Sequence, residues 1–125
     1  MKIPFSPPYI TEAVINEVTD ALRSGWITTG PKVKALEEEI KKFSGATEAL
    51  CVNSWTSGAI LMLHWLGVKA GDEVIVPAYT YSATALAVLH VGATPIMVDV
   101  EDDFNIGVEA VRRAITYKTK AIIPV

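Results

Sequence analysis

From residue 46 onward, short apolar runs alternate with longer segments that have the composition of helices. The apolar runs are nearly continuous and do not alternate with polar residues, which is typical of strands buried on both faces of a sheet. Strands joined by helices predict an α/β fold with a mostly parallel sheet and helices on both faces. The expected strands are residues 48–53, 72–78, 94–100 and 119–125, and the expected helices are 56–68, 82–92 and 107–115.

The first 45 residues have a different pattern, which predicts two amphipathic helices. Apolar residues recur at the spacing of one helical face in the segments 11–25 and 31–45, and a glycine ends each segment. Thr11 can cap the first helix, and Pro31 suits the first turn of the second. The loop "GWITTG" joins the two helices and contains one aromatic and two threonine side chains.

Composition and charge argue against several classes of protein. Half of the 125 residues are hydrophobic and the formal net charge is −3, which argues against nucleic acid or an anionic membrane as the main partner. The single cysteine, Cys51, has no partner for a disulfide within the chain, so a reducing, cytoplasmic location is expected. No apolar run is long enough to span a bilayer, and the proline-rich start "MKIPFSPPYI" does not resemble a signal peptide.

The domain organisation follows from the change of pattern near residue 46. Residues 1–45 are expected to form an N-terminal helical segment with its loop, and residues 46–125 the first part of a larger α/β domain. The chain stops in the apolar run "TKAIIPV", which leads us to expect that it is the N-terminal part of a longer protein. The alternative is a complete small domain in which this run forms an edge strand.

The stretch "NSWTSG" at residues 53–58 lies where the first expected strand gives way to a helix. Free N–H groups and a positive partial charge at a helix N-terminus attract phosphate, so this bend is a candidate anion site. Capping of the helix by Ser54 or Thr56 is the alternative. The sequence contains neither G-x-G-x-x-G nor G-x-x-x-x-G-K-[ST], which argues against a nicotinamide dinucleotide and an ATP P-loop.

The second expected strand ends in "PAYTYSATA", which places two tyrosines at its carboxyl end. In parallel sheets, ligands bind at this edge of the sheet. Tyr79 and Tyr81 can therefore offer a face on which a planar ring stacks, and the alternative is that one of them packs on the sheet edge.

The remaining polar residues do not indicate another site. His64 and His90 fall within apolar helices and are expected to be packed or partly exposed rather than ligands. The acidic turn "DVEDDFN" lacks the spacing of a calcium loop, and no His/Cys cluster predicts zinc, so no metal is expected. Lys118 and Lys120, which flank the last expected strand, are interpreted as surface lysines.

Several blocks of the sequence occur together and in a family-specific order. They are "LRSGWITTGPKVKALEEEI", "NSWTSGAILML", "LGVKAGDEVIVPAYTYSATALAVLHVGATPIMVDVEDDFNI" and "AITYKTKAIIPV". From about residue 20 to its end, the chain resembles the DegT/DnrJ/StrS family of pyridoxal-phosphate (PLP)-dependent sugar aminotransferases. The blocks "GWITTGPK" and "GDEVIVPAYTYSATA" are most similar to members that aminate nucleotide-linked 4-keto-sugars.

The resemblance implies a fold and a cofactor site. The fold would be the N-terminal part of the large domain of PLP-dependent transferase fold type I, the aspartate aminotransferase type. In the family, the turn that corresponds to "SWTS" binds the cofactor phosphate, which maps onto Trp55, Thr56 and Ser57, with Thr56 as the main side chain. Many relatives have Gly or Ala at the position of Trp55. The family's stacking aromatic corresponds to Tyr81, which leaves Tyr79 a structural role.

The resemblance also implies substrates and partners. Trp26, Thr28 and Thr29 of the "WITTG" loop are implied to contact a nucleotide-linked keto-sugar, with glutamate as the amino donor. Relatives are homodimers with sites built across the interface. The lysine that forms the Schiff base with the cofactor is expected beyond residue 125. The alternatives are a non-catalytic fragment or cofactor-binding module, and a sugar dehydratase of the same fold with histidine in place of that lysine.

Overall fold

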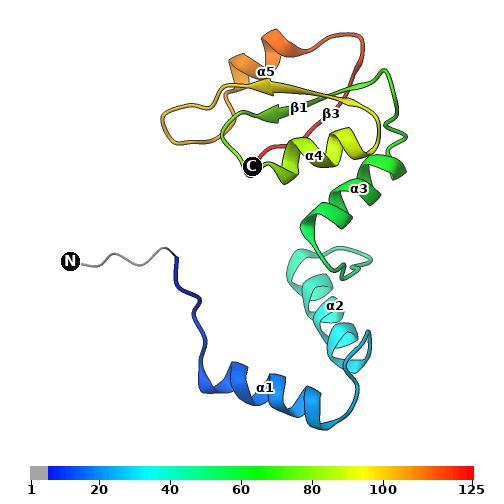
Figure 1. Cartoon of the computed structure of the whole chain (residues 1–125), viewed down its shortest axis with the longest axis vertical. Helices are drawn as coiled ribbons and strands as arrows, with labels where there is room; N and C mark the ends of the chain where they lie inside the picture. The colour runs from blue at the N-terminus through cyan, green and yellow to red at the C-terminus, as the bar shows by residue number, and fades with distance from the viewer. Residues whose placement is uncertain (1–5) are drawn as a thin grey trace, which may run out of the picture. The chain divides into compact units, whose positions relative to one another are not determined.

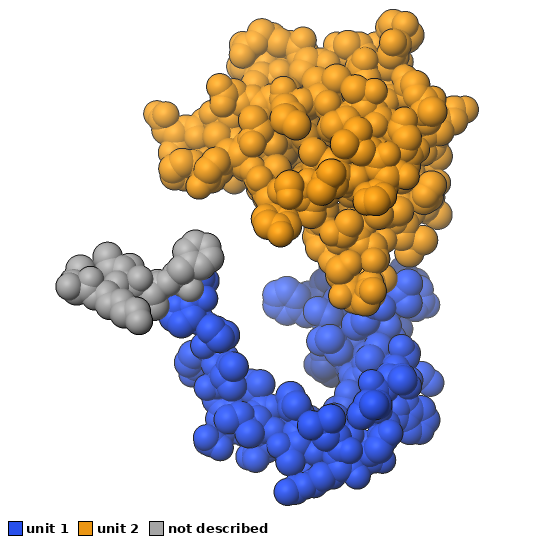
Figure 2. All heavy atoms as spheres, viewed as in Figure 1, with its two compact units in different colours: residues 1–51 blue, residues 52–125 orange. Residues whose placement is uncertain are grey.

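The computed structural model of the chain describes residues 6–125, which divide into two compact units (Figure 2). Unit 1 is Met1–Cys51 and unit 2 is Val52–Val125. Residues 1–5 lie outside the described residues. They are the first residues of the proline-rich start and of the expected N-terminal helical segment. The boundary expected between residues 45 and 46 stays a prediction.

Residues 6–51 of unit 1 contain two helices, as the amphipathic pattern predicted. Helix α1 (Glu12–Arg23) begins after Thr11, whose hydroxyl accepts a hydrogen bond from the N–H of Val14 at 3.4 Å. Helix α2 (Pro31–Ser44) has proline at its first position and ends at Gly45, where φ is 72°. The backbone conformation of Gly45 is left-handed, which favours glycine because it has no Cβ.

The apolar faces of α1 and α2 are largely exposed, and neither helix contains a buried residue. Within this unit, the Lys32 ammonium group forms an ion pair with the Glu17 carboxylate. Both side chains are exposed, and exposed ion pairs stabilise a fold only weakly. The described part of unit 1, residues 6–51, therefore has little hydrophobic core of its own.

Unit 2 is a parallel three-stranded sheet with helices on both faces (Figure 1). The central strand β1 (Glu73–Pro77) pairs with β2 (Thr94–Val98) on one side and β3 (Thr119–Ile122) on the other. Helix α4 (Ala83–His90) connects β1 to β2 on one face, and α5 (Val108–Ala114) connects β2 to β3 on the other. Helix α3 (Trp55–Trp65) packs on α4.

The hydrophobic core lies between β1 and the helices α3 and α4. Val74 and Val76 of β1 are fully buried and cluster with Val88 of α4 and Leu63 of α3. Ile75 lies between the two valines in sequence and is also fully buried, because successive side chains of a strand point to opposite faces. The strand β1 is therefore covered on both faces, as its continuous apolar run predicts.

The prediction of a strand over residues 48–53 was wrong, so the described chain has three strands instead of four. A strand exists only where a neighbour supplies ladder hydrogen bonds, and this run pairs with neither β2 nor β3, the edge strands of the sheet. The N–H of Cys51 instead donates to the carboxylate of Glu37 at 2.8 Å. An apolar run indicates a segment that is suited to burial, but it does not show which strand that segment would pair with.

The other expected helices and strands are confirmed, with ends that differ by one or more residues from the expected ones. Helices α3 and α4 are followed by Gly67 and Gly92, which have φ values of 74° and 79°. Among the helices of residues 6–125, none combines the length and apolar character that crossing a bilayer requires.

Candidate functional site

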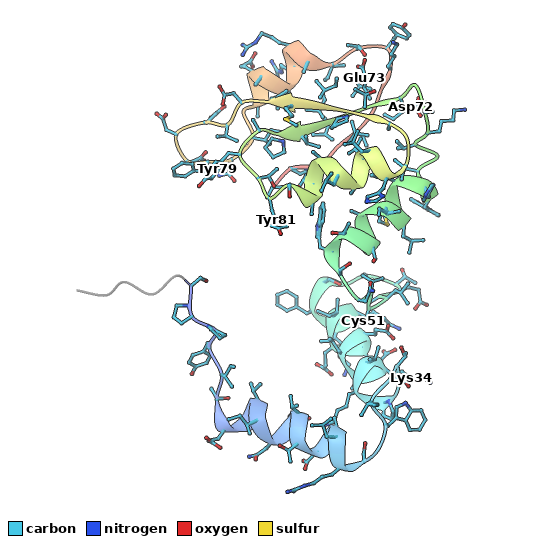
Figure 3. The ribbon with its side chains drawn as sticks, in the orientation of Figure 1. Lys34, Cys51, Asp72, Glu73, Tyr79 and Tyr81 are labelled. Carbon is cyan, nitrogen blue, oxygen red and sulfur yellow. The ribbon has the colours of Figure 1, made fainter. Side chains whose placement is uncertain are left out.

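A cavity of about 980 Å³ opens at the carboxyl edge of the parallel sheet. Figure 3 shows Tyr79 and Tyr81 near this edge of β1, whereas Asp72 and Glu73 mark the opposite end of the strand. The cavity wall combines the start of α3, the segment after β1, the turn after β2 and the end of the chain. It is lined by Trp55, Thr56, Ala78, Tyr79, Thr80, Tyr81, Ala83, Thr84, Asp103, Phe104, Asn105 and Val125.

The N-terminus of α3 forms one side of this cavity. Ser54 is the N-cap, and its hydroxyl oxygen accepts a hydrogen bond from the N–H of Ser57 at 3.1 Å. The capping alternative is therefore confirmed for Ser54. The N–H groups of Trp55 and Thr56, at the first two helical positions, have no carbonyl partner within the helix and can donate to an anion.

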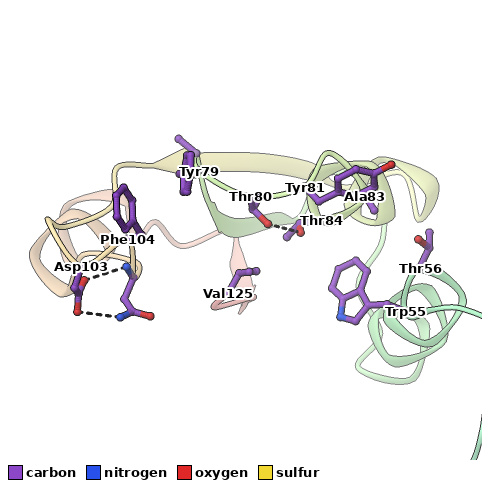
Figure 4. Close-up of a pocket in the computed structure, with 12 residues that line it drawn as sticks. Trp55, Thr56, Tyr79, Thr80, Tyr81, Ala83, Thr84, Asp103, Phe104 and Val125 are labelled. Atoms are coloured by element: carbon purple, nitrogen blue, oxygen red, sulfur yellow. Dashed lines mark hydrogen bonds between the residues drawn. The ribbon is translucent and has the colours of Figure 1, made fainter. Parts of the chain in front are cut away.

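Trp55 and Thr56 line the cavity, whereas Ser57 does not. Figure 4 shows the Trp55 indole and the Thr56 hydroxyl on the α3 side of the cavity. The hydroxyls of Ser54 and Ser57 are 3.0 Å apart and hydrogen-bonded to each other. The structure thus places two of the three expected phosphate-binding residues at the cavity and involves the third in the cap.

Tyr81 lies at the cavity from the segment that follows β1, and its side chain is 82% exposed. The segment is held at both ends. The N–H of Ala78 donates to the carbonyl of Val98 at 2.7 Å, and the hydroxyls of Thr80 and Thr84 are 2.9 Å apart (Figure 4). These bonds tie the segment to β2 and to α4, so the Tyr81 ring is presented from an anchored backbone.

Tyr79 packs against Phe104, with the ring centroids 5.3 Å apart and the planes inclined by 37°. This agrees with the expected structural role of Tyr79. The ring also lines the cavity, on the side opposite the α3 N-terminus (Figure 4). The two tyrosines that sequence reasoning separated by role therefore belong to one cavity wall.

The turn after β2 is a part of the wall that sequence reasoning missed. One carboxylate oxygen of Asp103 accepts from the N–H of Asn105 at 3.0 Å, and the other accepts from its side-chain amide at 2.9 Å. These hydrogen bonds, the side-chain one foremost, hold the pKa of Asp103 below its ordinary value. Phe104 between them has φ of 66°, the left-handed region that is unusual for a side chain of this size.

A signal for this turn was present in the sequence. Asp and Asn two residues apart are typical of side chains that hydrogen-bond to the backbone in turns. The turn also follows a parallel strand, β2, whose carboxyl end lies at the same edge as that of β1. The rule that was applied to the tyrosines therefore applied equally to residues 103–105.

The residues expected to contact a substrate lie in unit 1, in the loop between α1 and α2. Trp26 and Thr28 line a small hollow of about 230 Å³, together with Gly30 and the neighbouring ends of the two helices. The indole N–H of Trp26 donates to the carbonyl of Thr29 at 3.0 Å. The hydroxyl group of Thr29 is not part of this hollow.

The sequence and fold match one family of enzymes. The model of the DegT/DnrJ/EryC1/StrS aminotransferase family matches residues 8–125. The chain belongs to this family. The resemblance stated from the sequence motifs is thereby confirmed.

Two similar curated proteins illustrate the family. The spore coat polysaccharide biosynthesis protein SpsC of Bacillus subtilis is 43% identical over 124 residues, which are 98% of this chain and 32% of SpsC. The UDP-4-amino-4-deoxy-L-arabinose–oxoglutarate aminotransferase of Shewanella sediminis is 45% identical over 124 residues, again 98% of this chain and 32% of the relative. The chain thus spans about a third of the length of these relatives.

Solved structures of the family have the same fold. Spr1654 of Streptococcus pneumoniae, assigned as a sugar aminotransferase, is 54% identical in its PMP form, with a TM-score of 0.88 over 99% of this chain and 32% of that structure. Its PLP form gives a TM-score of 0.87 at 53% identity, over 98% of this chain and 31% of that structure. The predicted fold class, the N-terminal part of a fold type I large domain, is confirmed.

The histidines and lysines that sequence reasoning set aside do not line the cavity. His64 and His90 are exposed on the surface of unit 2, and neither lines the cavity. Lys118 and Lys120 are also exposed, as expected of surface lysines, and they do not line it either.

Proposed function

We propose that the protein to which this chain belongs is a PLP-dependent aminotransferase that transfers an amino group from glutamate to a nucleotide-linked keto-sugar. The reaction would serve amino-sugar or cell-surface polysaccharide biosynthesis. One observation carries the proposal: in a member of an aminotransferase family, the free N–H groups of α3 and the ring of Tyr81 meet at one cavity on the carboxyl edge of a parallel sheet.

The α3 N-terminus would hold the phosphate of the cofactor. The N–H groups of Trp55 and Thr56 would donate to phosphate oxygens, and the Thr56 hydroxyl would add a further bond. Ser57 would contribute less in this geometry, because its N–H already donates to Ser54. The positive partial charge at the helix terminus supports the same arrangement.

Tyr81 would offer its ring face to the pyridine ring of the cofactor. Its anchored backbone and its exposed ring suit such stacking, which contributes about 0.5–1.5 kcal/mol beyond the area that it buries. When bound, PLP supplies an electron sink and a carrier for the amino group. The chain's own residues would bind and orient it.

The loop in unit 1 would contact the sugar substrate through Trp26, Thr28 and Thr29. An indole ring suits packing on a sugar or a base, and hydroxyl groups can donate to or accept from sugar hydroxyls and phosphates. Support comes from the name of the Shewanella relative, which acts on a UDP-linked amino-sugar and oxoglutarate.

The proposal includes a homodimer in the cytoplasm. Family resemblance supports dimerisation, and the exposed apolar faces of α1 and α2 are suited to burial in a larger assembly. Light scattering on the purified protein measures the mass directly. A monomer at working concentration would contradict this part of the proposal.

Binding of PLP tests the cofactor site in the protein that contains this chain. The Tyr81→Ala substitution is expected to weaken PLP binding by about twofold to tenfold, the factor that corresponds to a lost stacking contact. Thr56→Val is expected to weaken it by about tenfold or more, because a hydrogen bond to a charged group is lost. Tyr117→Ala is the matched control, since Tyr117 is 93% exposed and does not line the cavity.

Two results would contradict the proposal. Unchanged PLP affinity in both Tyr81→Ala and Thr56→Val would remove the cofactor site from this cavity. A separate assay supplies UDP-4-amino-4-deoxy-L-arabinose and oxoglutarate and measures the glutamate that forms. A protein that binds PLP but forms no glutamate with any UDP-linked amino-sugar would not be the proposed sugar aminotransferase.

A further inference from the structure

The indole of Trp26 lies directly on the backbone of Gly30. A Cβ at residue 30 would lie 2.2 Å from the indole nitrogen and 2.5 Å from the neighbouring ring carbon Cδ1. A Cβ atom does not make non-bonded contacts this short, so the indole would have to move. Gly30 is buried, whereas the Trp26 side chain that covers it remains 58% exposed.

The backbone of Gly30 does not itself require glycine. Its φ of −167° is extended, and any residue can adopt it. Gly107, the N-cap of α5, has φ of −72°, and a Cβ there would meet its nearest neighbours at 3.4 Å, an ordinary contact. Neither of these two N-cap glycines needs a left-handed backbone, and only at Gly30 does a neighbouring side chain occupy the place of the Cβ.

Trp26 is held in this position by two hydrogen bonds within the loop, and a third bond ties the loop to α1. Its indole N–H donates to the carbonyl of Thr29 at 3.0 Å, and its backbone N–H donates to the hydroxyl of Ser24 at 3.1 Å. The Ser24 hydroxyl donates in turn to the carbonyl of Ala21 in α1 at 2.7 Å. The loop thus holds the ring from the α1 side.

Gly30 is held from the other side by α2. Its carbonyl accepts the first hydrogen bond of the helix, from the N–H of Lys34 at 3.1 Å, and Pro31 follows it at the first helical position. Because the helix fixes this backbone, an added Cβ would displace the indole, which can rotate about its side-chain bonds, and break its bond to Thr29.

We infer that Gly30 is a positioning residue, whose missing Cβ provides the seat that holds the Trp26 indole in place beside Thr28. Both side chains line the same hollow as Gly30. This inference rests on the proposed function for its consequence, namely that the seated ring is the surface against which the nucleotide-linked sugar packs. The steric seat itself stands on the geometry alone.

The first test observes the ring in the complete protein. The protein is labelled with 5-fluorotryptophan, and the fluorine resonance of Trp26 is assigned as the one that disappears in Trp26→Phe. Gly30→Ala is expected to shift this resonance, whereas the matched control Gly107→Ala leaves it in place. An unmoved Trp26 resonance in a folded Gly30→Ala protein overturns the inference.

The second test measures kinetics with UDP-4-amino-4-deoxy-L-arabinose and oxoglutarate. Gly30→Ala is expected to raise the KM for the sugar nucleotide by between about threefold and tenfold, a change within the range of coupling energies between residues in contact. The kcat and the KM for oxoglutarate are expected to stay near their original values. In a Trp26→Ala background, the same Gly30→Ala change is expected to have no further effect, because the ring that it displaces is absent.

The outcomes separate the inference from the function on which it rests. A shifted resonance with an unchanged sugar KM, or an equal effect of Gly30→Ala with and without Trp26, overturns the positioning role. If the unsubstituted protein transfers no amino group from any UDP-linked amino-sugar, the proposed function is overturned instead. In that case the fluorine resonance still decides whether Gly30 seats the ring.

Discussion

Phe104 permits a test of how the cavity wall is built, because two substitutions remove the same ring and differ only in whether residue 104 keeps a Cβ. Its φ of 66° lies in the left-handed region, which costs a residue with a Cβ about 1–2 kcal/mol. Phe104→Ala keeps this cost, whereas Phe104→Gly removes it. Both variants lose the packing of the ring on Tyr79.

The expected difference between the two variants follows from these terms. Glycine gains about 1–2 kcal/mol from the left-handed conformation and loses about 0.5–1 kcal/mol through the greater freedom of its unfolded chain. Phe104→Gly should therefore be more stable than Phe104→Ala by about 0.5–1 kcal/mol. Both should be less stable than the unsubstituted protein, because an aromatic pair contributes about 0.5–1.5 kcal/mol beyond its buried area.

Urea denaturation of the complete protein, followed by circular dichroism, measures this difference. The midpoints should rank as unsubstituted, then Phe104→Gly, then Phe104→Ala, with equal slopes in all three curves. PLP affinity should fall equally in both variants, because both lose the same ring from the cavity wall. A Phe104→Gly protein that is no more stable than Phe104→Ala would refute the claim that this turn is strained.

Two further predictions concern the core and the turn. Val88→Ala should lower the free energy of unfolding by about 2–3 kcal/mol, through lost methyl groups and the space they leave, whereas Leu89→Ala, at a side chain that is 54% exposed, should cost less than about 1 kcal/mol in the same urea assay. The hydrogen bonds from Asn105 lower the pKa of Asp103, so their contribution to stability is present above its ordinary value of 3.8 and is lost as the pH falls through the lower pKa of the folded state. The difference in thermal midpoint between the unsubstituted protein and Asp103→Asn should therefore stay constant well above pH 3.8 and shrink below it, and a difference that does not depend on pH would contradict this assignment.

The sequence predicted those parts of the fold that depend on local signals. Helices α1 and α2 begin and end at residues whose backbone preferences mark helix ends, such as Pro31 and Gly45. The parallel sheet followed from continuous apolar runs separated by helices. The run 48–53 has the same composition, but its pairing depends on a partner strand, which local sequence does not specify.

The candidate site was predicted in its position and only partly in its composition. The rule for parallel sheets placed Tyr81 at the carboxyl edge, and the expected helix N-terminus in "NSWTSG" indicated Thr56. The cavity contains both residues, although the strand expected before Thr56 does not form. The contribution of Phe104 was missed because it depends on contact with Tyr79, which lies far away in sequence. Whether Ser57 donates to a ligand or to Ser54 was equally undetermined, because both uses favour the same small hydroxyl residue.

Strand β1 is buried on both faces and lies between β2 and β3, which affects how unit 2 unfolds locally. Local opening free energies are highest where backbone hydrogen bonds are most deeply buried, so the amide protons of residues 74–76 should exchange with solvent only through the largest openings of unit 2. Neither helix of unit 1 contains a buried residue, and these helices can fray at much lower cost. The segment that carries Tyr81 should therefore be attached to a slowly exchanging strand of unit 2, whereas the loop that carries Trp26 joins two helices whose amide protons exchange faster.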